Sequence, residues 1–194
     1  MKSLLPPPAR RALAPLAATL VLACNGDAAT DADTLLADTG GPPDTELPEV
    51  YINEFMASNT HTYPDEGGAF PDWVELYNAS DVEADLSGWW ITDDNNNLFK
   101  HRFAEGVSIP AKGFVVVFCD GDTDEGPLHT SFQLDAAGGE DLGLYGPNVL
   151  DNPVVDSIDA FGPQASDVSL ARSPDGANNW VVAEEPTPGA SNGG

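Results

Sequence analysis

The pattern of apolar and polar positions divides the chain into three segments of different character. Residues 12–23 are almost entirely apolar. Residues 25–49 carry few large apolar side chains and no aromatic one. From residue 50 onward, short apolar or alternating runs are separated by clusters of Gly, Pro, Asn and Asp. The pattern therefore predicts a leading segment at 1–23, a linker at 24–49 and one folded domain at 50–194.

The domain is predicted to consist of β-strands, because its apolar runs have strand length and turn signals recur between them. In residues 73–77, Val74 and Leu76 share one face opposite Glu75, which predicts a half-buried strand. Residues 113–118 are apolar throughout, which predicts a central strand covered on both faces. The predicted strands span 50–56, 73–77, 88–92, 98–103, 113–119, 131–134, 141–145, 154–160, 168–171 and 180–182.

The fold class follows from the absence of helical patterns. No stretch of the domain offers three turns of helical periodicity without a Gly or a Pro. An all-β chain has to bury the apolar faces of its sheets against each other. The sequence therefore predicts a β-sandwich of two antiparallel sheets packed face to face, with a closed barrel as the alternative.

Seven motifs follow one another along the domain. They are INEFMASN at 52–59, DWVELYN at 72–78, DLSGWWITD at 85–93, the apolar run at 113–118, GEDLGLY at 139–145, SPDG at 173–176 and TPGASN at 187–192. Their order over residues 50–192 resembles the lamin-tail domain, in particular its bacterial secreted versions. The resemblance implies an immunoglobulin-like β-sandwich, which agrees with the strand pattern.

The motifs also have plausible roles in the scaffold. One of the adjacent indoles Trp89 and Trp90 is expected to fill the core, and the other to lie at the surface or at a sheet edge. The side chain of Asn78 can hydrogen-bond backbone groups where the strand at 73–77 ends. Residues 174–176 have the Pro-Asp-Gly sequence of a turn.

The N-terminus has the features of an export signal. A basic region at 1–11 precedes the apolar run at 12–23, which is too short to span a bilayer as a helix and is typical of a secretory signal. The run ends in Val-Leu-Ala-Cys at 21–24, which resembles the lipobox of bacterial lipoprotein signals. That resemblance implies cleavage before Cys24 and lipidation of its thiol. The alternative is an ordinary cleaved signal in which Cys24 has no role.

The charge of the chain restricts its partners. The chain has 32 acidic and 7 Lys and Arg residues, a formal net charge of -25, and 7 of the acidic residues lie in the linker at 25–49. Such a linker is expected to be extended and disordered, as a tether between the lipid and the domain. An acidic surface repels phosphate backbones and anionic lipid headgroups, so nucleic acid is excluded as a partner.

An acidic loop is the candidate metal site. Asp120, Asp122 and Asp124 alternate along a Gly-rich segment, and such carboxylates can converge on Ca²⁺. The loop is not an EF-hand, because Glu125 and Ser131 stand where that motif needs Gly and Glu. The alternative is a solvated acidic turn without a metal, and no other cofactor is expected.

Candidate binding residues lie in two further loops. Tyr63 in the loop at 59–70 is a possible apolar anchor, or it folds back onto the core. Asp93, Asp94 and Asn95 offer oxygen ligands, or they belong to an exposed hairpin loop.

The sequence offers no pattern of catalytic residues. It contains neither Gly-x-Ser-x-Gly nor a Walker loop, and its three histidines have no paired metal-ligand spacing. His129 follows the acidic loop, where it can orient a carboxylate or serve as a polar turn residue. Cys119 ends an apolar run and is expected to be a buried small hydrophobe. No enzymatic activity is therefore predicted.

The sequence thus predicts a non-catalytic, exported lipoprotein, anchored at the outer membrane or cell surface of the envelope through Cys24. Its lamin-tail-like module would bind an envelope or extracellular protein or a polysaccharide. One alternative is a Ca²⁺-dependent adhesion or matrix module. Another is an accessory protein of an extracellular hydrolase.

The lipid anchor can be tested by substitution of the cysteine. Cells that express the chain are expected to incorporate radioactive fatty acid into it, and the Cys24→Ala variant is expected to lose the label, since the thiol is the proposed acceptor. Autoradiography of the purified chain measures this. Labelling that persists in Cys24→Ala would reject the anchor.

Overall fold

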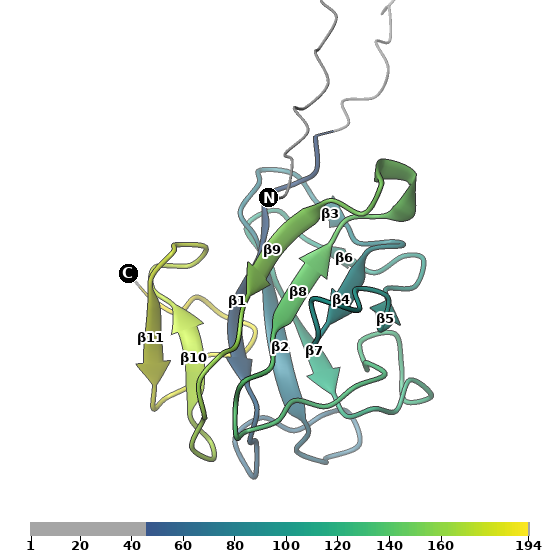
Figure 1. Cartoon of the computed structure of the whole chain (residues 1–194). Helices are drawn as coiled ribbons and strands as arrows, with labels where there is room; N and C mark the ends of the chain where they lie inside the picture. The colour runs from purple at the N-terminus through teal and green to yellow at the C-terminus, as the bar shows by residue number, and fades with distance from the viewer. Residues whose placement is uncertain (1–45, 194) are drawn as a thin grey trace, which may run out of the picture. The chain divides into compact units, whose positions relative to one another are not determined.

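A computed structural model of the chain describes residues 46–193, and the predicted signal, Cys24 and nearly all of the predicted tether lie outside these residues. The described part is all-β apart from one 3₁₀ turn (Figure 1), and none of its helices is long and apolar enough to cross a membrane. The elements are β1 (Val50–Met56), β2 (Asp72–Asn78), β3 (Ala84–Asp85), β4 (Trp90–Thr92), β5 (His101–Arg102), β6 (Ser108–Ile109), β7 (Phe114–Cys119), β8 (Leu142–Tyr145), η1 (Asn148–Leu150), β9 (Val154–Ile158), β10 (Ser169–Arg172) and β11 (Trp180–Ala183).

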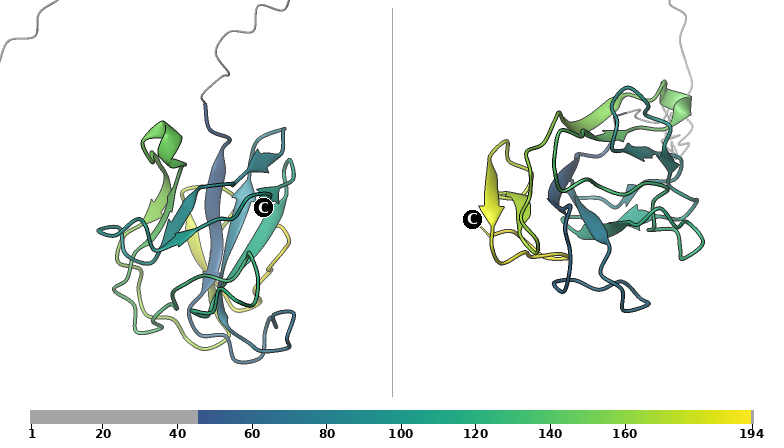
Figure 2. Two further views of the ribbon diagram at one scale, coloured as in Figure 1. Left: turned by 90° about the vertical axis from the view of Figure 1, so that its right-hand side faces the viewer. Right: turned by 60° about the horizontal axis from the view of Figure 1, so that its bottom comes forward.

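Two sheets form the layers of a sandwich, which confirms the predicted fold class. One sheet has the strand order β11-β10-β1-β2-β7 and the other has the order β5-β4-β8-β9, and β3 and β6 form a separate pair. The pairings between these strands are all antiparallel. The side view in Figure 2 shows β8 and β9 in one layer and β1, β2 and β7 in the other.

The main hydrophobic core lies between the two layers. Ile52 and Phe55 from β1 pack there with Ile91 and Leu144 from β4 and β8, and all four side chains are fully buried. Burial of apolar surface on this scale is the dominant favourable contribution to folding. The inward faces of both sheets therefore hold the layers together.

The tandem indoles divide as predicted. Trp89 is buried in the core. Trp90 is half-buried at the neighbouring position, where its Nε1 donates a hydrogen bond to Asn148 Oδ1 at 2.8 Å and its ring packs edge-on against Phe99. Adjacent residues of a strand point to opposite faces, so only one of the two rings can enter the core.

Several predicted strands are shorter in the structure, and two were missed. The predicted strand at 98–103 is reduced to β5, and residues 131–134 contribute an isolated bridge between Gln133 and Asp120. The missed strands β3 and β6 have two residues each, which is too short for a periodic pattern. The well-predicted strands are the long ones, because alternation needs several residues to be recognised.

The apolar run at 113–118 was predicted to be a central strand, and this is wrong, because β7 is the last strand of its sheet. Part of its free edge is paired with a loop instead. The N–H of Phe118 donates to the carbonyl of Leu128 at 2.7 Å, and the N–H of Thr130 donates to the carbonyl of Phe118 at 2.8 Å. The loop thus supplies hydrogen bonds that a neighbouring strand would give.

The expectation that β2 is buried on one face alone is also wrong. Glu75, on its polar face, is fully buried like Val74 and Leu76. Its Oε1 accepts a hydrogen bond from Asn53 Nδ2 at 3.0 Å, and its Oε2 accepts one from the N–H of Gly189 at 2.6 Å. The period-2 pattern placed the residues on the correct faces, but the chain beyond β11 covers the polar face.

Residues 187–192, here called the C-terminal segment, are held over β1 and β2 by hydrogen bonds. The N–H and the hydroxyl of Thr187 donate to the carboxylate of Glu54. Asn192 Nδ2 donates to the carbonyls of Asn53 and Arg172 at 3.1 and 2.9 Å. The TPGASN motif therefore closes the outer face of the larger sheet.

Burial raises the pKa values of three carboxylates of β1 and β2. Loss of solvation raises the pKa of Glu75 from 4.5 to about 8, against the hydrogen bonds from Asn53 and Gly189. The same cause raises the pKa of Glu54, and it raises that of Asp72 to about 6. These carboxyl groups therefore keep their protons to higher pH in the folded protein than in the unfolded chain.

These pKa shifts predict that the domain loses stability as pH rises. Between pH 4.5 and about 8 the folded chain retains a proton on Glu75 that the unfolded chain has lost. The contribution of Glu75 to the free energy of unfolding is therefore greatest below pH 4.5 and falls as pH rises from 4.5 to about 8, by up to about 1.4 kcal/mol per pH unit. Urea unfolding at several pH values measures the slope. Glu75→Gln is expected to flatten it, whereas Glu83→Gln at an exposed site should not, and equal slopes in both variants would contradict the assignment.

Candidate functional site

Two loops come together at one end of the sandwich. The loop between β1 and β2 (57–71) and the loop after β7 (120–130) both lie at the lower end of the domain in Figure 1. Because β1 and β7 run in the same direction on either side of β2, their following loops emerge at the same end. Two of the three predicted candidate regions therefore share one surface.

The first loop is anchored by Asn59, which is buried. Asn59 Nδ2 donates to the carbonyls of Tyr63 and Pro71 at 2.7 and 2.8 Å. Its Oδ1 accepts hydrogen bonds from the N–H groups of Thr62 and Tyr63 at 3.1 and 3.3 Å. One side chain thus uses both donors and its acceptor to hold the loop in place.

Tyr63 packs against the outer face of β2 and β7 and also lines a groove. Its ring stacks on Phe118 with centroids 6.0 Å apart and meets Trp73 edge-on at 6.3 Å. The groove has a volume of about 400 Å³, and Phe114 and Leu128 lie in its wall with Tyr63. Tyr63, the predicted anchor, is therefore held by aromatic packing against the sheet. It also contributes aromatic surface to the groove.

The alternating aspartates of the acidic loop act mainly on the loop itself. Asp120 Oδ1 accepts the N–H of Asp122 at 2.9 Å, and Asp122 Oδ1 accepts the N–H of Asp124 at 3.1 Å. These are the side-chain-to-backbone bonds of successive Asx turns. Within the described residues, Asp122 and Asp124 do not belong to the group of ligand atoms that gathers around Asp120.

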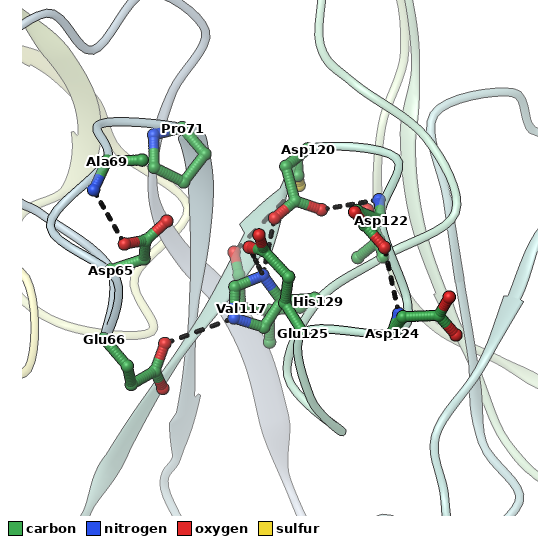
Figure 3. A network of polar contacts seen from close by, with 12 residues as sticks. Asp65, Glu66, Ala69, Pro71, Val117, Asp120, Asp122, Asp124, Glu125 and His129 are labelled. Atoms are coloured by element: carbon green, nitrogen blue, oxygen red, sulfur yellow. Dashed lines mark hydrogen bonds and ion pairs between the residues drawn. The ribbon is translucent and has the colours of Figure 1, made fainter.

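The structure brings Asp120 together with Glu125 and His129 instead (Figure 3). His129 Nδ1 lies 2.5 Å from Asp120 Oδ2 and 3.5 Å from Glu125 Oε2. From the other loop, Glu66 Oε2 lies 3.2 Å from His129 Nε2. A buried imidazole thus stands between three carboxylates.

Two opposing effects act on the pKa of His129. Burial by itself lowers it, because the charged imidazolium loses solvation. The hydrogen bonds to Asp120 and Glu66 and the charges of both carboxylates raise it by more. The net result is a pKa above the ordinary value for histidine.

The loop at 93–97 is held by its polar side chains. Asp93 is buried and forms an ion pair with Lys100 at 2.5 Å. Asn95 Nδ2 donates to Asp159 at 2.9 Å, and its Oδ1 accepts the hydroxyl of Tyr145 at 3.0 Å. Asp94 Oδ1 accepts the N–H of Asn96 at 2.9 Å. The predicted binding residues Asp93, Asp94 and Asn95 therefore all take part in the structure of the loop.

The sequence did not identify the cluster around His129. The residues that meet are separated by five and four positions within the loop, and Glu66 comes from a distant segment. The one available signal was the position of His129 directly after an acidic loop. Cys119 is buried as predicted, and burial raises the pKa of its thiol.

Comparison with known proteins identifies one family. The family model described as Lamin Tail Domain matches residues 43–173, which is more than half of the chain. The match ends just after β10, so the strand β11 and the C-terminal segment lie beyond it. No match was found among the curated proteins.

The role of Asn59 predicts a loss of stability on truncation. Asn59→Ala removes four hydrogen bonds and leaves partly buried backbone groups without these partners, which is expected to cost about 1–3 kcal/mol. Chemical denaturation measures this change. Asn96→Ala at an exposed position of another loop is the matched control, and an equally small effect of both substitutions would show that Asn59 does not anchor the loop.

Proposed function

The chain belongs to the lamin-tail-domain family, and from this we propose that it is a non-catalytic lipoprotein of the cell envelope whose β-sandwich binds an envelope or extracellular protein or a polysaccharide. The domain would be exported, anchored through the lipid on Cys24 and held away from the membrane by the acidic linker. An immunoglobulin-like module in this position is suited to recognition through the loops at its ends.

The groove beside Tyr63 is the observation on which the binding proposal depends. Tyr63, Phe114 and Phe118 bring aromatic surface to a concavity of about 400 Å³ on a rigid sheet. Aromatic side chains combine large apolar contact area with little conformational freedom, and they are enriched at binding sites for this reason. Asp65 and Glu66 at the same groove add negative charge, which favours neutral or basic partners.

The chemistry of the described residues supports a non-catalytic role. Cys119 is the free thiol of this part of the chain, and it is buried with a raised pKa. A nucleophilic thiol needs exposure and a lowered pKa. Asp93, Asp94 and Asn95 are occupied in holding their own loop, which leaves the Tyr63 groove as the favoured contact surface.

Site-specific photo-crosslinking in cells tests the groove. Replacement of Tyr63 in the full chain by p-benzoylphenylalanine keeps an aromatic ring at the groove, and ultraviolet light is expected to give a covalent adduct with the partner. Immunoblotting detects adducts, and their sensitivity to protease or to glycan-degrading enzymes separates protein from polysaccharide.

The control carries the same crosslinker at Val149. This side chain is 88% exposed, and it belongs to η1 at the opposite end of the domain from the Tyr63 loop (Figure 1). An adduct at 63 with none at 149 is the expected result. The absence of an adduct at 63, or the same adduct from both positions, would contradict binding through this groove.

A further inference from the structure

The ligand atoms of Asp120, Glu125 and His129 have the spacing of a metal site. One ligand atom from each residue lies within 4.8 Å of the other two. Ligand atoms that share a tetrahedral Zn²⁺ are roughly 3.4 Å apart, because each lies about 2.1 Å from the metal. His129 Nδ1 and Glu125 Oε2, which are 3.5 Å apart, already meet this value. His129 Nδ1 and Asp120 Oδ2 are 2.5 Å apart and would have to move apart by about 1 Å to reach it.

The cluster has more negative charge than its own residues can neutralise. His129 is 2% exposed and is approached by Asp120, Glu125 and Glu66. Even a protonated imidazole neutralises the charge of only one of the three carboxylates. Among residues 46–193, no Lys or Arg forms an ion pair with any of them. A divalent cation would supply the missing positive charge.

Glu66 occupies the position of an outer-shell partner. Its Oε2 lies 3.2 Å from His129 Nε2, on the side of the ring away from Asp120 and Glu125 (Figure 3). A metal-bound histidine usually donates its second ring N–H to a carboxylate or a carbonyl, which fixes the tautomer and the ring orientation. With Nε2–H directed to Glu66, the lone pair of Nδ1 points toward the two remaining carboxylates.

The backbone and one aromatic ring hold Asp120 and His129 in place. Asp120 uses Oδ1 to accept the N–H of Asp122, which leaves Oδ2 directed at the imidazole. The ring of His129 packs against Phe118 with centroids 5.1 Å apart. The hydrogen bonds between residues 128–130 and the edge of β7 fix the backbone on both sides of His129. These two preorganised ligands would lose little conformational freedom on binding.

A cavity beside the cluster gives access from solvent. It has a volume of about 290 Å³ and is lined by Glu66, Gly67, Glu125 and His129. Three protein ligands beside an open space match the arrangement in which a fourth position is left to water or to an incoming ligand. The cavity therefore provides both an entry path and room for that fourth ligand.

From this geometry we propose that Asp120, Glu125 and His129 bind Zn²⁺, with Glu66 as the hydrogen-bond partner of the imidazole. Zn²⁺ accepts imidazole nitrogen together with carboxylate oxygen at low coordination number. Ca²⁺ prefers about six to eight oxygen ligands, and the buried nitrogen at the centre of this cluster does not suit it. The metal site does not rest on the proposed binding at the Tyr63 groove.

Calorimetric titration of the full chain with Zn²⁺ tests the proposal. The chain carries Cys24→Ser throughout, so that this thiol contributes no metal ligand. One Zn²⁺ per chain is expected to bind at micromolar concentration or tighter, and Co²⁺ is expected to give the visible absorption of a tetrahedral site. Excess Ca²⁺ should not displace either metal.

Three substitutions locate the site. Glu125→Gln and His129→Gln are each expected to lower the Zn²⁺ affinity by roughly tenfold or more, since each removes a ligand. Glu66→Ala should weaken binding by roughly 10–100-fold with an unchanged stoichiometry. Asp124→Asn is the matched control, because it changes the same charge in the same exposed loop outside the cluster.

Glu125 and Glu66 are 53% and 72% exposed, so their variants are expected to fold normally, and circular dichroism without metal checks this. The proposal is overturned if the folded chain binds no Zn²⁺, or if Glu125→Gln and His129→Gln bind Zn²⁺ as tightly as the unsubstituted chain. It is also overturned if Ca²⁺ competes and the loss falls on Asp124→Asn. None of these results would bear on crosslinking at position 63.

Discussion

The structure depends on the burial of carboxylates between β1, β2 and the C-terminal segment. Glu54 and Glu75 are fully buried on the outer face of a sheet whose inner face forms the apolar core. A buried polar group is tolerated only with hydrogen-bond partners, and these come from Asn53, Thr187 and Gly189. The last residues of the chain are therefore as much a part of the fold as its central strands.

The same constraint explains the contrast between the two acidic loops. At 93–97 the buried Asp93 has a cation, Lys100, and Asn95 has neutral or acidic partners that satisfy its amide. Around His129 three carboxylates face one imidazole, and the described residues supply no further cation. In the loop at 93–97, Asp93 and Asn95 therefore already have partners for their polar groups. The cluster around His129 has the charge and the geometry to accept a metal.

The sequence predicted correctly those features that depend on a short-range pattern of residues. The long strands, the core position of Trp89, the capping role of Asn78 and the buried Cys119 all followed from local alternation or from a neighbouring turn. It failed where a distant segment supplied the partner. Alternation placed Glu75 on an open face, but residues 187–192 cover that face. The apolar run predicted β7 at the centre of its sheet, but it is an edge strand whose edge pairs with residues 128–130.

The sequence by itself determined the fold class and the family, since alternation, turn residues and the order of motifs are local or sequential properties. It also determined the acidic character, from which we predict that nucleic acid is not a partner. Only the tertiary structure decided which polar residues act together. Asp120 meets Glu125, His129 and Glu66 rather than Asp122 and Asp124, because side-chain convergence depends on how two loops leave the sheet, and no spacing along the chain records that.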